Sequence, residues 1–189
     1  MEMTNWQKRI CLEITNTIRK KSEEGQLIQP KEISTELIRK GFLNSENHKS
    51  QFEVIFRQCI EKNEDLKEIS ERNGTSYYYS TQSMGETYAK ILSKMRENPF
   101  SLIAEIVREN SEIYPRPIPL EIFKESPFDL THEEILAFLN KMAEQEEYQD
   151  IARTTTSVGT IFLYSTRYLE PHYASSLAEW LDVGQANNP

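Results

Sequence analysis

Asn73-Gly74-Thr75-Ser76-Tyr77-Tyr78-Tyr79-Ser80-Thr81 and Val158-Gly159-Thr160-Ile161-Phe162-Leu163-Tyr164-Ser165-Thr166 are two versions of one segment, 85 residues apart. They share a glycine, a threonine and a final Tyr-Ser-Thr. The same offset pairs Tyr88 with Tyr173 after this segment and Ile33 with Ile118 before it. Self-similarity at a fixed offset is typical of a duplicated structural unit.

Nearer the N-terminus of each copy the offset changes to 89. Ile14, Ile18 and Arg19 then match Ile103, Val107 and Arg108. A loop about four residues shorter in the second copy explains the change, because loops tolerate such differences.

Hydrophobic spacing predicts three helices before the first of these segments. Trp6, Ile10, Ile14 and Ile18 recur every four residues, which predicts a helix over residues 6–24. A short helix from Pro30 to Gly41 and a third helix over 49–63 follow. Asn73-Gly74 then predicts a tight hairpin with positive φ at its turn. Three helices and a hairpin, in this order, are typical of a winged helix-turn-helix.

The second copy repeats the order. Leu120, Ile122 and Phe123 mark its second helix, and Thr131 with Glu134 forms a capping box at the start of its third. An amphipathic helix follows each wing. The fold class is therefore predicted as mainly α with small β hairpins (α+β), as two winged helix-turn-helix domains in tandem. The expected parts are winged helix 1 (1–82), a linker helix (83–97), winged helix 2 (98–168), and an amphipathic helix with a frayed tail (169–189).

Composition narrows the function classes. No apolar stretch approaches the roughly 20 residues of a membrane span, and the N-terminus lacks a signal-peptide pattern, so we expect a cytoplasmic protein. Cys11 and Cys59 lie among apolar residues and are interpreted as buried core thiols. Three dispersed histidines give no metal spacing. No phosphate loop or catalytic motif is present, so we expect neither a cofactor nor an enzyme.

Two segments leave alternatives open. Pro115-Arg116-Pro117-Ile118-Pro119 is interpreted as a stiff loop before a helix, the alternative being a polyproline ligand. The final amphipathic helix is expected to fold back on its own domain, the alternative being burial in another chain. Its apolar residues are the candidate partner-binding set: Tyr173, Leu177, Trp180 and Leu181.

Charge separates a DNA reader from a protein adapter, because duplex binding depends on neutralising phosphates. Residues 1–82 contain 13 Lys and Arg against 13 Asp and Glu, whereas residues 83–189 contain 9 against 17. The second copy should therefore be repelled by DNA. In the first copy the candidate DNA-binding residues are Arg39, Lys40, Lys49, Gln51, Arg57, Gln58, Lys67 and Arg72.

The layout of paired winged helices with an acidic balance resembles that of the bacterial segregation and condensation protein B family. The resemblance covers the layout only and transfers no residue. It implies winged helices that bind a partner polypeptide. We therefore expect a non-catalytic adapter or regulatory subunit that acts by contact with a protein partner or, as a homodimer, with a second copy of itself. The alternative is a transcription regulator that reads DNA through the first copy.

Overall fold

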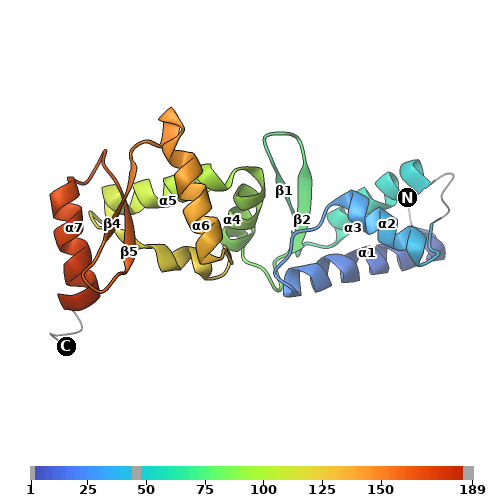
Figure 1. The fold of residues 1–189 in the computed structure, drawn as a ribbon. Helices are drawn as coiled ribbons and strands as arrows, with labels where there is room; N and C mark the ends of the chain where they lie inside the picture. Colours follow the sequence, from blue (N-terminus) through green and yellow to red (C-terminus); the bar gives the residue numbers. More distant parts are fainter. Residues whose placement is uncertain (1–2, 44–47, 185–189) are drawn as a thin grey trace. The chain divides into compact units, whose positions relative to one another are not determined.

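The computed structural model describes residues 3–43 and 48–184, without the side chains of residues 48–50 (Figure 1). The chain is mostly helical, with small antiparallel sheets. It divides into two compact units, residues 1–93 and 94–189.

The first unit follows the predicted order of elements. Its three helices are α1 (Asn5–Glu23), α2 (Pro30–Arg39) and α3 (His48–Lys62), and its hairpin is made of β1 (Leu66–Ser70) and β2 (Ser76–Ser80). Helix α4 (Glu86–Glu97) follows. Thr4 caps α1 through a capping box with Gln7, and the four-residue apolar stripe of α1 lies inside the core, except that Trp6 is exposed.

The second unit has a three-stranded sheet. Its elements are α5 (Pro99–Ile113), β3 (Ile118–Pro119), the 3-10 helix η1 (Leu120–Lys124), α6 (His132–Ala143), the 3-10 turn η2 (Glu146–Tyr148), β4 (Ile151–Thr155), β5 (Ile161–Ser165), α7 (Pro171–Glu179) and the π-helical turn η3 (Trp180–Gly184). The strand order is β3-β5-β4, with antiparallel pairs throughout. Thr131 and Glu134 form the predicted capping box at α6.

The segment around Ile118 differs from the prediction. Ile118 lies in β3 and pairs with Leu163, and in the first unit Ile28 forms the matching bridge with Tyr78. Ile118 is thus the counterpart of Ile28 and not of Ile33, which lies in α2. The predicted second helix of this copy is a five-residue 3-10 helix, because Pro117 and Pro119 favour extended backbone immediately before it.

The strand position of Ile118 also bears on whether the proline-rich segment is a structural loop or a polyproline ligand. Pro117 is buried and Pro119 lies in β3, so this part of the segment belongs to the fold of the unit.

Both hairpins have the same turn. The Glu71 amide donates to Thr75 O at 2.8 Å, and the Thr156 amide donates to Thr160 O at 3.0 Å. Gly74 and Gly159 have φ of +85° and +92°. In each turn only the glycine has positive φ. A three-residue hairpin loop needs one left-handed residue, whereas the two-residue turn that Asn-Gly favours needs two.

Each hairpin is fixed by a buried polar cluster that sequence analysis missed. Arg19 binds Asp65 through two hydrogen bonds of 2.8 and 2.9 Å, and Ser80 Oγ donates to the same carboxylate at 2.7 Å. In the second unit Arg108 and Ser165 bind Asp150 in the same way. The repetition of these contacts confirms that the two copies share one architecture, including the change of offset from 89 to 85.

A helix serine completes each cluster. Ser22 Oγ donates to Ile18 O and accepts the Ser80 amide at 2.8 Å. Ser111 Oγ accepts the Ser165 amide at 2.9 Å. These bonds attach the end of the second strand to the first helix of its unit. They also satisfy the backbone amides of Ser80 and Ser165 with a side-chain acceptor in place of a neighbouring strand.

The three consecutive tyrosines of β2 are all buried. Tyr78 packs edge-on against Phe56 with ring centroids 4.8 Å apart, in the helical core. Tyr77 and Tyr79 lie on the opposite face with Met84 and Ala89 of the α4 segment. The alternation of side chains in a strand explains this division. In the second unit Tyr164, Leu169 and Ala174 form the corresponding cluster.

Candidate interaction surfaces

The basic residues at the end of α2 are engaged by acids of the same unit. Arg39 donates to both carboxylate oxygens of Glu36 at 2.9 and 2.6 Å. Lys40 lies 3.1 Å from Glu13 Oε2 and 3.7 Å from Glu36 Oε1. The Arg39 guanidinium also lowers the pKa of the Glu36 carboxyl. These cations are therefore partly neutralised before any phosphate approaches.

The remaining predicted DNA contacts are divided between α3 and the hairpin. Gln51 and Arg57 are exposed on α3, whereas Gln58 is half-buried with its Oε1 inside the protein. The side chain of Lys49 lies outside the described residues. Lys67 is exposed on β1 and Arg72 is exposed at the turn. Arg57 is thus the predicted cation that α3 itself presents to solvent.

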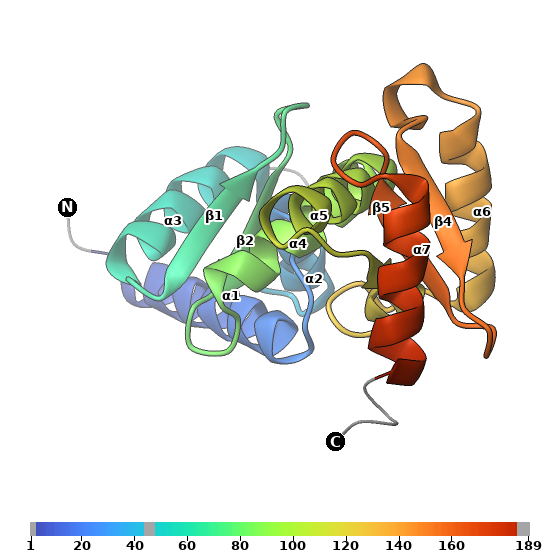
Figure 2. The same cartoon turned by 90° about the vertical axis from the view of Figure 1, so that its left-hand side faces the viewer.

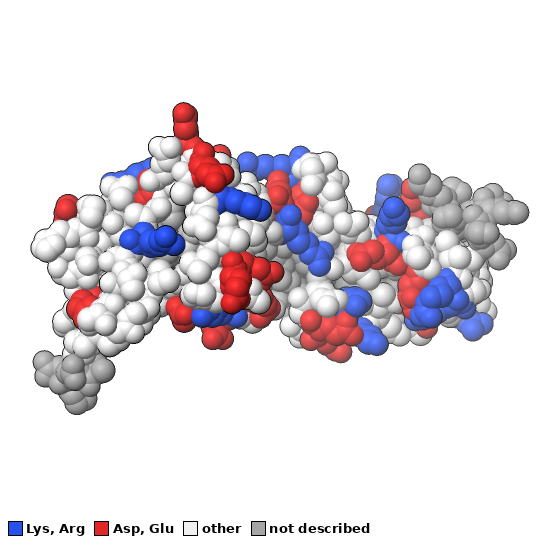
Figure 3. Space-filling model, viewed as in Figure 1, with Lys and Arg blue, Asp and Glu red and all other residues white. Residues whose placement is uncertain are grey.

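The two units differ in net charge. Residues 1–93 contain 14 Lys and Arg against 14 Asp and Glu, whereas residues 94–189 contain 8 against 16. Acidic and basic atoms are interspersed on the face shown in Figure 3. The second unit carries the whole excess of negative charge, which disfavours contact with a polyanion.

The predicted partner-binding residues lie on and just after α7. The side chains of Tyr173 and Trp180 are 52% and 55% exposed, and Leu177 and Leu181 are half-buried. Tyr173 and Trp180 are seven residues apart, or about two helical turns, so they share one side of the helix. Two large aromatic side chains are therefore presented to solvent together.

Helix α7 is attached to the sheet of its own unit (Figure 2). Ala174 and Ala178 are buried on its inner side, and Thr154 of β4 donates to Ser175 Oγ at 3.2 Å. The structure therefore agrees with the prediction that this helix folds back on its own domain.

Two further hydrogen bonds join the turn between β4 and β5 to the end of α7. The Ser157 amide donates to Glu179 Oε2 at 2.8 Å, and Thr156 Oγ1 donates to Asp182 Oδ2 at 2.6 Å. These contacts fix the segment that carries Trp180, so its exposed ring is held on an ordered support.

The repeat allows the two surfaces to be compared position by position. The second unit exposes large apolar side chains where the first has polar residues. The residues of the second unit are Ile113, Tyr114, Val158 and Tyr168, and their counterparts are Glu23, Glu24, Asn73 and Ser83. These side chains are not required by the shared fold, since the first copy folds without them.

An apolar hollow of about 450 Å³ lies beside Leu181. Its walls include Pro117 and Pro119 at the edge strand and Phe162 on β5. Arg116, at its mouth, lies over the Tyr114 ring at 5.5 Å from the centroid. The hollow adds concave apolar area next to the exposed aromatic residues of the tail.

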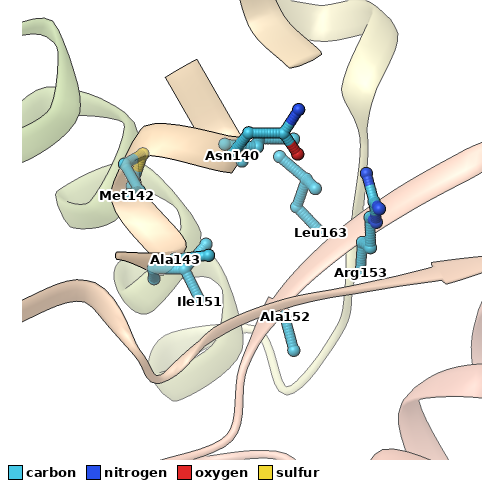
Figure 4. Close-up of a pocket in the computed structure, with 8 residues that line it drawn as sticks. Asn140, Met142, Ala143, Ile151, Ala152, Arg153 and Leu163 are labelled. Carbon is cyan, nitrogen blue, oxygen red and sulfur yellow. The ribbon is translucent and has the colours of Figure 1, made fainter. Parts of the chain in front are cut away.

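A second hollow, of about 190 Å³, separates α6 from the hairpin (Figure 4). Met142 of α6 and Leu163 of β5 line its apolar part, with Asn140 and Arg153 as its polar residues. Its small volume suits one side chain of a partner better than a small-molecule ligand.

Within residues 3–43 and 48–184, no group of three or more His, Cys, Asp or Glu is placed to hold a metal ion. In the same part of the chain, no helix has the length and apolar character needed to cross a membrane.

Comparison with known proteins gives a family model that matches the second unit and a relative whose alignment extends beyond that unit. Residues 97–186, which include every element from α5 to η3, match the family model described as YdhW C-terminal domain. The chain is also similar to the protein YdhW of Escherichia coli (strain K12), with 32% identity over 138 residues. That alignment covers 71% of this chain and 64% of YdhW, so the chain spans less than two thirds of the length of this relative. No solved structure matched the chain.

Proposed function

We propose that this protein is a non-catalytic tandem winged-helix adapter or regulatory subunit that binds another protein through the outer face of α7. The exposed pair Tyr173 and Trp180 is the observation on which this proposal depends. Aromatic residues of this kind are enriched among the residues that dominate binding energy at protein interfaces.

The winged-helix part of the proposal rests on the order of elements. In the second unit a helix, a short edge strand, a 3-10 turn, a helix and a two-stranded hairpin follow one another. The edge strand β3 pairs with β5, which makes the three-stranded sheet expected beside the helices of a winged helix. The first unit has the same order, with a single bridge in place of the edge strand.

The repeat supports contact through the second unit. Exposed apolar side chains gathered in one copy mark a binding surface more often than single, scattered ones do. The second unit has Tyr114 and Val158 where the first has Glu24 and Asn73. Because the shared fold is made without them, binding explains their presence better than stability does.

Site-specific photocrosslinking in the native cell tests the proposal. A photoreactive residue at Trp180 should give one discrete protein adduct, which Tyr173→Ser in the same chain should weaken at least fivefold. Val54, 56% exposed on α3 of the first unit, is the matched control and should give no such adduct. Equal crosslinking from both positions would contradict binding through α7.

DNA binding by the first unit is the second candidate function. The exposed side chains of Arg57 and Gln51 on α3 favour it, because both types can contact base edges. The acid partners of Arg39 and Lys40 reduce the expected number of phosphate contacts. A mixed-sequence duplex should therefore give negligible gel shift at moderate salt. A tight, salt-sensitive shift abolished by Arg57→Ala would make DNA binding the better proposal.

A further inference from the structure

Two cysteines, Cys11 of α1 and Cys59 of α3, meet where the two helices pack together. Cys59 of α3 is fully buried, whereas Cys11 of α1 is half-buried and reachable from solvent. Cys59 Sγ donates to the backbone oxygen of Cys11 at 3.2 Å, so the buried thiol of α3 lies directly against residue Cys11 of α1. The fold thus places together two cysteines that are 48 residues apart.

The surroundings of the pair are polar for an interior site. Thr15 Oγ1 lies 3.3 Å from Cys59 Sγ, and Asn63 Nδ2 lies 3.8 Å from the same sulfur. The same two side chains donate to the backbone oxygens of the two cysteines, Thr15 Oγ1 to Cys11 O at 2.9 Å and Asn63 Nδ2 to Cys59 O at 2.7 Å.

The two thiols differ in acidity. The neighbouring Cys59 thiol lowers the pKa of Cys11 to about 7; burial opposes this change, and Thr15, Lys62 and Asn63 support it. The contact with Cys11, together with burial, raises the pKa of Cys59. The more accessible thiol is therefore the first to become a thiolate, the reactive form of cysteine.

We propose that Cys11 and Cys59 are a hydroperoxide-sensitive pair that closes to an intramolecular disulfide. In the first step the Cys11 thiolate attacks a peroxide oxygen. An S–O bond forms and the O–O bond breaks, so that Cys11 becomes a sulfenic acid and the peroxide is reduced to hydroxide or alkoxide, which takes up a proton.

The second step needs no further oxidant. Cys59 Sγ attacks the Cys11 sulfur, an S–S bond forms, and the S–O bond breaks. The hydroxyl group leaves with the Cys59 proton as water. The product joins α1 to α3, and an external thiol reverses it by exchange.

Treatment of the reduced full-length chain with hydrogen peroxide at neutral pH tests the pair. Intact mass should show the loss of two hydrogens, and proteolysis should yield one linked peptide containing Cys11 and Cys59. Dithiothreitol should restore both thiols. Cys11 should react at least tenfold faster in the folded chain than in the same chain unfolded in denaturant at the same pH.

Two variants separate the steps. Cys59→Ser should stop the reaction at a Cys11 sulfenic acid, which a dimedone probe labels, and Cys11→Ser should abolish both products. Circular dichroism of each variant shows whether its fold is retained. The rate at which Cys11 reacts with hydrogen peroxide is measured in the wild-type chain, so that this test does not depend on either variant. Oxidation only to disulfide-linked dimers, or a folded-state rate no faster than the unfolded one, would overturn the proposal.

Discussion

The guanidinium of Arg108 binds the carboxylate of Asp150 through two hydrogen bonds, Nε to Oδ2 at 3.0 Å and Nη2 to Oδ1 at 2.6 Å. Arg19 and Asp65 make the same pair in the first unit. In each unit the aspartate stands just before the hairpin and the arginine stands on the first helix. The pair thus joins the first helix of each unit to the start of its hairpin, 46 residues further along the chain in the first unit and 42 in the second.

Arg108→Ala should destabilise the second unit by about 2 kcal/mol, because the buried Asp150 carboxylate loses two charge-assisted hydrogen bonds and keeps only the half-exposed Arg167, at 3.1 Å, as its cation. Denaturant unfolding followed by fluorescence measures the change. Lys124→Ala is the matched control, since its ion pair with Glu121 is exposed and should contribute less than about 0.5 kcal/mol. Equal effects of the two variants would show that the buried pair is not structurally important.

The aspartates predict an acid transition. The Arg19 hydrogen bond lowers the pKa of Asp65 to about 2. Burial alone would raise the pKa of Asp150, but Arg108 and Ser165 outweigh it and bring this pKa also to about 2. Because the folded-state values are depressed, the stabilisation is complete above the unfolded value near 3.8 and is lost as the pH falls from about 4 to 2.

The shift corresponds to roughly 2 kcal/mol for each aspartate. Asp150→Asn should make the free energy of unfolding of the second unit less dependent on pH over this window, as measured by urea unfolding at several pH values. Glu125→Gln, at an exposed carboxylate, should leave the dependence as in the wild type. A transition unchanged by Asp150→Asn would contradict the assignment.

The turn glycines should not tolerate side chains. Gly74→Ala and Gly159→Ala should each cost about 1 kcal/mol or more, because φ near +90° is strained for any residue with a Cβ, although no atom crowds either site. Gly85→Ala is the control variant, because no atom lies near a Cβ at this position and the φ of Gly85 is not positive. Thermal unfolding of the three variants gives the comparison, and a loss at Gly85 as large as at the turns would contradict it.

Ala178→Glu should separate α7 from the sheet, because this position is buried on the helix that packs against β4 and the new carboxylate would be an unpaired buried charge. We expect faster hydrogen exchange and proteolysis confined to residues after Thr166. Ser176→Glu, on the exposed side of the same helix, should leave the exchange pattern unchanged. Loss of the Trp180 adduct in Ala178→Glu alone would connect this packing to the proposed binding face.

Local sequence patterns determined the order of helices and hairpins, the duplication and the turn glycines. Each depends on neighbouring residues: the four-residue apolar spacing of α1, the capping box at Thr131 and the glycine of each turn. Whether Ile118 forms a strand or a helix could not be predicted in this way, because its partner Leu163 lies 45 residues further along the chain.

The candidate binding face was predicted only in part. Tyr173 and Trp180 followed from the helical pattern, but their exposure depends on which side of α7 meets the sheet. The additional residues Tyr114 and Val158 were missed, although comparing the two copies at matched positions is a signal that finds them.

The sequence by itself determined that two similar units follow one another and that the second carries the negative charge, since periodicity, turn residues and charge are local properties. Only the tertiary structure decided that Arg108 reaches Asp150, that Cys11 meets Cys59, and that α7 covers its own sheet. These contacts join residues more than 20 positions apart, and the packing of the whole unit selects them from many pairings that the letters alone would allow.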